Sequence, residues 1–195
     1  MSNNPHRRFK SSPKRRYLPL AIAVLLGLGI GLWTSHLLEV RAKEQGEELS
    51  QTVISLVGQA AKLKETRELD EARNLLKAAL KMMEPAPELH QSEPYINVLT
   101  SLAALELSES SPEEEGVAQA IQYLEDAWKY SSGAKDKIRA TIAKERAFAE
   151  LLSANMDDAI LWLNRAADLD PDEEEVVKQV EVVERYKSWR ERIKR

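Results

Sequence analysis

The side chains that most often perform chemistry are few in this sequence and lie far apart along it. The three histidines, His6, His36 and His90, are scattered along the chain. Cysteine is absent, which excludes disulfides, thiolate zinc sites and cysteine nucleophiles. The motifs of zinc proteases, serine hydrolases, phosphate-binding loops and dinucleotide-binding turns do not occur either. We therefore expect that the protein is not an enzyme and uses no cofactor.

One short segment resembles the beginning of a calcium-binding loop. Asp168, Asp170 and Asp172 alternate as the first ligands of such a loop do. However, Glu173 occupies the position that requires glycine, and Gln179 occupies the position of the final glutamate. We therefore predict no metal site here and assign these aspartates to the capping of helix ends.

The elements that must carry any function show one repeated helical pattern. In three stretches an alanine is followed by a large apolar residue after four positions, an alanine after seven and an apolar residue after eight. These offsets lie on one face of a helix and alternate small with large side chains, so that helices can pack closely. The three sets are Ala72/Leu76/Ala79/Leu80, Ala120/Leu124/Ala127/Trp128 and Ala159/Leu163/Ala166/Ala167.

The composition, with 43% hydrophobic residues, 31% charged residues and seven glycines, suits a helical domain. Apolar periodicity and prolines predict three helical pairs, followed by a long helix over 172–193 whose apolar stripe caps the stack. The pairs are 53–64 with 70–83, 94–107 with 117–130, and 135–152 with 157–169. The capping stripe consists of Val176, Val180, Val183, Tyr186, Trp189 and Ile193. The predicted fold class is therefore all-α.

These residues resemble the tetratricopeptide repeat, a helix–turn–helix unit of about 34 residues. The best match is 147–171, and the resemblance extends over about 52–171. The most specific part of the match is the run 155–160 followed by Leu163, Ala166, Ala167, Leu169, Asp170 and Pro171. The chain departs from the family pattern in its key alanines, which are 48 and 39 residues apart. Arg146 also replaces an apolar residue, and Ala154 replaces the usual turn glycine. An unrelated array of helical hairpins is the alternative.

The resemblance implies a concave face, lined by the first helix of each pair, that binds an extended or helical protein segment. The implied partner-binding residues are Ile54, Val57, Lys64, Asn97, Thr100, Thr141, Lys144 and Phe148. The paired lysines and asparagines with which some members of the family clamp a terminal carboxylate are absent, apart from Lys144. The alternative for each residue is ordinary packing or surface.

The N-terminal part of the chain predicts a membrane anchor. Residues 17–38 carry no formal charge and are long enough to cross a bilayer as a helix. The first seventeen residues hold six basic and no acidic side chains, which places the N-terminus in the cytoplasm and the C-terminal domain on the periplasmic or other extracytoplasmic side. The rest of the chain is acidic, which argues against nucleic acid as a partner. A cleaved signal peptide is the alternative to an uncleaved anchor.

Within this segment small residues recur at every fourth position. They are Ala23, Gly27, Gly31 and Ser35. Such a stripe lets two membrane helices approach closely, which would give a homodimer, although glycine is also common in membrane helices for other reasons.

The sequence thus predicts a basic cytoplasmic tail (1–16), a transmembrane signal anchor (17–38), a stalk (39–51), a repeat domain (52–171) and a capping helix (172–195). We expect a single-pass protein of the inner (plasma) membrane whose repeats bind another protein as a scaffold, in envelope assembly, secretion or chaperoning. That expectation rests on analogy of fold. The alternative is a structural oligomer that dimerises through the membrane helix and spaces a larger complex.

Overall fold

The structure is a computed structural model that describes residues 40–41, 43–109 and 115–193. The chain divides into two compact units, 1–45 and 46–195. In the first unit, the described residues 40–41 and 43–45 are helical. The predicted membrane segment 17–38 and its stripe of small residues lie outside the described residues. Among the helices that are described, none is both long enough and apolar enough to cross a bilayer.

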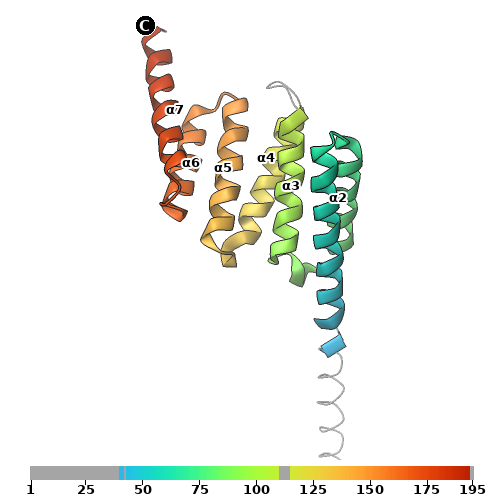
Figure 1. The fold of residues 1–195 in the computed structure, drawn as a ribbon. Helices are drawn as coiled ribbons and strands as arrows, with labels where there is room; N and C mark the ends of the chain where they lie inside the picture. Colours follow the sequence, from blue (N-terminus) through green and yellow to red (C-terminus); the bar gives the residue numbers. More distant parts are fainter. Residues whose placement is uncertain (1–39, 42, 110–114, 194–195) are drawn as a thin grey trace, which may run out of the picture. The chain divides into compact units, whose positions relative to one another are not determined.

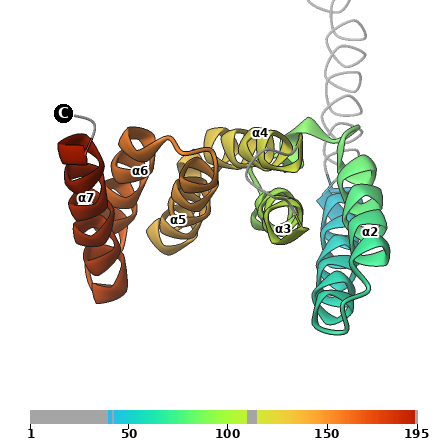
Figure 2. The same ribbon diagram turned by 90° about the horizontal axis from the view of Figure 1, so that it is seen from above.

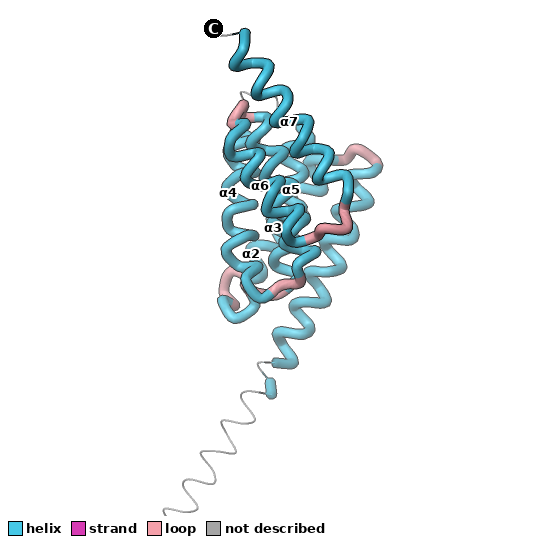
Figure 3. The backbone as a smooth tube through the Cα atoms, turned by 90° about the vertical axis from the view of Figure 1, so that its left-hand side faces the viewer, coloured by secondary structure: helices cyan, strands magenta, loops and turns pink. Residues whose placement is uncertain are grey.

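The described residues of the second unit form helices joined by turns and contain no strand (Figures 1 and 3). A first helix over 46–65 precedes α2 (Leu69–Met83), α3 (Glu93–Glu109), α4 (Glu115–Tyr130), α5 (Asp136–Leu152), α6 (Met156–Leu169) and α7 (Glu174–Ile193). Short 3₁₀ turns, Pro87–Leu89 and Ser131–Gly133, precede α3 and α5. The all-α prediction is confirmed for this part of the chain, and the bounds of α2 to α7 lie within two residues of those predicted.

The helices pack in sequence order, mainly against their neighbours along the chain. The most extensive contacts join α3 with α4 and α5 with α6, while α2 packs on α3, α4 on α5 and α7 on α6. A further contact joins α3 with α5, so that first helices of successive pairs also touch. In Figure 2, α3 is seen nearly end-on beside α4.

The repeated alanine–leucine pattern is buried in all three copies, which confirms its predicted packing role. The buried set comprises Ala72, Leu76, Ala79, Ala120, Leu124, Ala127, Ala159, Leu163 and Ala166. The residue at offset eight is half-buried in each copy. The pattern therefore identifies the packing face of the second helix of each pair.

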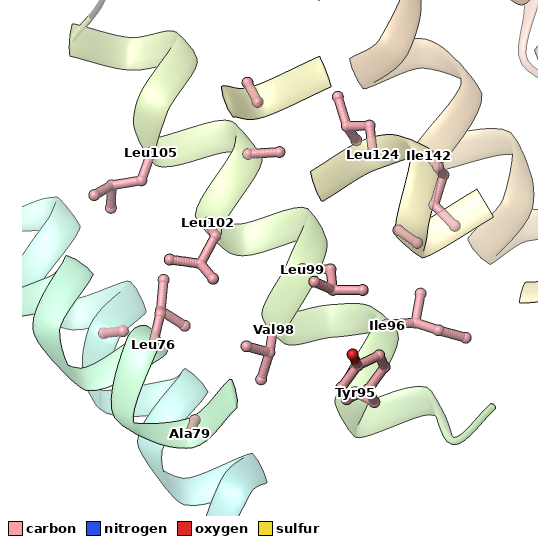
Figure 4. Close-up of a cluster of buried hydrophobic side chains, with 14 of the residues drawn as sticks. Leu76, Ala79, Tyr95, Ile96, Val98, Leu99, Leu102, Leu105, Leu124 and Ile142 are labelled. Atoms are coloured by element: carbon pink, nitrogen blue, oxygen red, sulfur yellow. The ribbon is translucent and has the colours of Figure 1, made fainter. Parts of the chain in front are cut away.

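Most of the large buried side chains belong to one cluster centred on α3 (Figure 4). Leu102 and Leu105 lie on the side of Leu76 in α2, whereas Ile96 and Leu99 point toward Leu124 and Ile142 of α4 and α5. Burying apolar residues on two sides makes α3 apolar around most of its circumference. This explains why the sequence of α3 shows little amphipathic periodicity, in contrast to that of α4.

The turns before α2 and α6 share one conformation. Arg67 and Ala154 have φ values of 65° and 59°, in the left-handed region that favours glycine. In each turn the next residue donates its backbone N–H to the carbonyl five residues back, from Glu68 to Leu63 (2.9 Å) and from Asn155 to Glu150 (2.8 Å). The turn at Ala154 thus adopts the conformation that favours glycine, although an alanine occupies the position.

Candidate protein-binding groove

A hollow with a volume of about 780 Å³ lies between α5 and α7. Helix α5 contributes one wall, and the beginning of α7 with the residues just before it contributes the other. The residues that line the groove include Lys144, Phe148, Leu151, Glu173 and Val182. Because α5 is the first helix of the third pair, the groove lies on the side predicted to be concave.

Large apolar side chains line this groove without being covered. Phe148 is 48% exposed and Leu151 is 36% exposed, whereas core residues such as Leu102 are fully buried. Val182, on the opposite wall, is 62% exposed. Exposed apolar side chains that gather at a hollow mark a surface that can bury them against a ligand.

An ion pair joins the two walls of the groove. The Lys144 Nζ atom donates to both carboxylate oxygens of Glu173, at 2.7 and 2.8 Å. This pair ties α5 to the residue just before α7. The Lys144 ammonium is therefore paired with a carboxylate of its own chain.

Two of the predicted partner-binding residues, Lys144 and Phe148, are brought together in the groove. Thr141 joins Lys144 in an adjoining hollow of about 350 Å³ that also contains Asp170 and Asp172. The hydroxyl of Thr141 donates to the Lys137 carbonyl at 3.0 Å within its own helix.

The remaining predicted residues lie on the earlier helices. Val57 and Lys64 line a smaller hollow of about 210 Å³ beside α3. Ile54 is exposed, while Asn97 and Thr100 are half-buried. The Thr100 hydroxyl donates to the Ile96 carbonyl at 3.0 Å, so this group is used within its helix.

The predicted cap on the stack is only half correct. Val176 and Val183 are buried and Val180 is half-buried, but Tyr186, Trp189 and Ile193 are exposed. The reason is that α7 continues past the N-terminal end of α6, as Figures 1 and 3 show. The sequence reasoning also missed Val182, whose spacing to the three exposed residues (4, 7 and 11) was the available signal.

An ion pair fixes α7 where it passes the beginning of α6. Lys187 donates to Asp157, one residue into α6. The hydrogen bond to Asp157, and next the negative charge of that carboxylate, raise the pKa of Lys187 above its ordinary value. The pair therefore links α7 to the first turn of α6.

Comparison with known proteins supports the fold. The structure is similar to the N-terminal domain of stress-induced protein-1 (STI-1) from C. elegans, with a TM-score of 0.55 and 18% sequence identity. The similarity covers 70% of this chain and 97% of that domain. No family model matches the chain, and no curated protein matches it.

These findings define the class of the molecule as a TPR-like helical-repeat fold. Within this fold, the groove between α5 and α7 combines a concave shape with exposed apolar side chains.

Proposed function

We propose that this chain is a non-enzymatic scaffold that binds a segment of another protein in the groove between α5 and α7. The observation that supports the proposal most strongly is the exposure of Phe148 and Leu151 at a hollow of a TPR-like stack. A segment that covered them would remove this apolar surface from water, which is the main driving force for such association.

The proposal includes a location. The uncharged segment 17–38 anchors the chain in the inner membrane, and the basic residues before it keep the N-terminus in the cytoplasm. The repeats then lie on the extracytoplasmic side, where the scaffold serves envelope assembly, secretion or chaperoning. This location rests on the charge pattern of the sequence.

The groove is tested by purifying the full chain with its bound proteins after crosslinking in native membranes. The informative variant is Phe148→Glu, and the control is Leu161→Glu, because Leu161 on α6 is also 48% exposed but does not line the groove. We expect Phe148→Glu to reduce the recovered partner about tenfold, as for a binding hot spot. Leu161→Glu should leave the recovery unchanged. Equal recovery from both variants would contradict the proposal.

The location is tested separately with a topology reporter fused after Arg195. A reporter that is active only outside the cytoplasm should be active in this fusion. Activity of a reporter that works only in the cytoplasm would overturn the proposed orientation while leaving the groove assignment intact.

A further inference from the structure

The second half of α7 presents an apolar face that nothing in the described part of the chain covers. We define the distal face of α7 as Val182, Tyr186, Trp189 and Ile193, each at least half exposed. Their spacing of 4, 7 and 11 places them on one side of the helix. Tyr186 and Trp189 also contact each other, with ring centroids 5.7 Å apart.

This face continues the groove. Val182 belongs to both, since it lines the groove and begins the distal face. The helix passes the beginning of α6 at Lys187 and continues six residues to Ile193, which is about 9 Å of further helix. A ligand lying in the groove would therefore reach the distal face without leaving the surface.

Basic side chains flank the distal face. At about 100° per residue, Arg185 and Arg192 fall on one side of it and Arg190 on the other. All three are exposed, and none forms an ion pair with a residue that the structure describes. Glu184 and Glu191 fall on the opposite side of the helix. Glu181, at the start of the face, falls on the same side as Arg185 and Arg192. The face is thus apolar at its centre and carries an excess of positive charge at its edges toward the C-terminal end of α7.

The flanking charges disfavour a second copy as the occupant. The spacing of the distal face is symmetric, so that two antiparallel copies of α7 could pair Val182 with Ile193 and Tyr186 with Trp189. The same arrangement would bring Arg185 of one copy near Arg192 of the other. Like charges at such positions are destabilising.

The shape of the surface disfavours a membrane as the occupant. The continuous surface is partly concave, because it begins in the groove beside Phe148. A flat bilayer cannot fill a groove, whereas a helix can.

We infer that the groove and the distal face of α7 together bind an amphipathic helix of a partner protein, whose apolar stripe is flanked by aspartate or glutamate. The acidic residues gather at the end of that helix that lies over Arg185, Arg190 and Arg192. The inference rests on the proposed function and specifies the chemistry of the partner.

The test uses the full chain in phosphatidylcholine nanodiscs and two labelled helical peptides of about 18 residues, long enough to form a helix on binding. Both peptides carry a leucine stripe, which is flanked by glutamates in one and by lysines in the other. We expect the glutamate peptide to bind about tenfold more tightly at low salt, as several exposed ion pairs would give. The charge-reversal variant Arg185→Glu/Arg190→Glu should invert this preference.

The apolar contribution is tested with Trp189→Ala/Ile193→Ala, which should weaken binding of the glutamate peptide about tenfold. Leu161→Ala serves as the control and should bind as the unchanged chain does. Absence of binding, or equal affinity for both peptides, would overturn the inference.

Two further readouts identify the other occupants. Disulfide crosslinking of Trp189→Cys chains to each other without peptide would assign the face to self-association and overturn the inference. A fluorophore on the same cysteine that becomes buried only in phosphatidylglycerol discs would assign it to the membrane, with the same consequence. If Phe148→Glu abolishes capture of the native partner but the peptides show no charge preference, the proposed function stands and this inference fails.

Discussion

The two halves of the repeat unit treat large apolar side chains in opposite ways. From the first helix to α4, leucine, isoleucine and valine residues are fully buried around α3. In α5 to α7 the second cluster consists of alanines and valines with Leu163, while Phe148, Tyr186 and Trp189 remain exposed. The first half thus buries most of its large apolar side chains, whereas the second half has a smaller core and leaves Phe148, Tyr186 and Trp189 exposed.

Beside its small core, the second half contains a buried network of polar contacts. The buried Arg146 guanidinium donates to the Glu150 carboxylate (2.9 Å), the Ile121 carbonyl (2.7 Å) and Glu125 (3.1 Å). Glu150 is also buried and accepts from the Asn155 side chain at 3.0 Å. This network joins α4, α5 and the turn before α6, at the point where the apolar core becomes thin.

The contrast between the two halves predicts its largest effect on stability in the first half. We predict that Leu102→Ala lowers the free energy of unfolding by about 3 kcal/mol, because it removes a fully buried side chain and leaves a cavity. The control Leu161→Ala, on an exposed side chain, should change it by less than about 0.5 kcal/mol. Urea unfolding of the full chain measures both values. Similar values for the two variants would contradict the assignment of the first cluster as the stabilising core.

The second expected effect concerns the polar network of the second half. Arg146→Met should lower the free energy of unfolding by about 2 kcal/mol, because Glu150 would remain buried without its cation. The double variant Arg146→Met/Glu150→Leu should recover most of this loss. If the double variant is instead less stable than the single one, the ion pair contributes stability beyond the cost of burying its charges.

A smaller effect is expected at the two left-handed turns. Ala154→Gly and Arg67→Gly should each raise the free energy of unfolding by about 0.5 kcal/mol, since relief of the left-handed strain exceeds the added chain entropy. Equal gains would show that the turns are equivalent in both halves. A loss of stability at either turn would mean that the side chain itself contributes there.

The smallest effect is a pH dependence in the first half. Burial, and next the charges of Tyr130, Asp126 and Glu84, raise the pKa of Tyr95. The folded state therefore binds the phenolic proton of Tyr95 more tightly than the unfolded state does. The resulting contribution of Tyr95 to the free energy of unfolding is complete below about pH 10 and is lost as the pH rises through the raised pKa. Tyr95→Phe should therefore flatten the loss of stability above pH 10, measured by urea unfolding at a series of pH values. The exposed Tyr186→Phe is the control, and equal profiles for the two variants would contradict burial of Tyr95 as the cause.

Much of the fold could be predicted because helical periodicity records which residues share a buried face. Ala159, Leu163 and Ala166 are buried as their spacing predicted, and the same holds for the two earlier copies of the pattern. The helix over 94–107 was predicted, but its position at the centre of the main core was not. A helix that is buried on several sides has little amphipathic periodicity from which its burial could be predicted.

The candidate site was predicted only in part, for a related reason. Periodicity places Tyr186, Trp189 and Ile193 on one face but does not show whether a neighbouring helix reaches that face. In the structure α6 begins at Met156, beside Lys187, and leaves this end of α7 uncovered. Phe148 and Lys144 were predicted from the resemblance, while Val182 required knowledge of where α7 lies.

The assignment of the groove and the distal face of α7 as one binding surface can be tested with a photoreactive amino acid at single positions of the full chain in living cells. Positions 148, in the groove, and 189, on the distal face, are compared with position 161, which is similarly exposed on α6 but lies outside both. We expect positions 148 and 189 to crosslink to the same protein and position 161 not to do so. Crosslinking to that protein from position 161 as well, or from none of the three, would contradict this assignment.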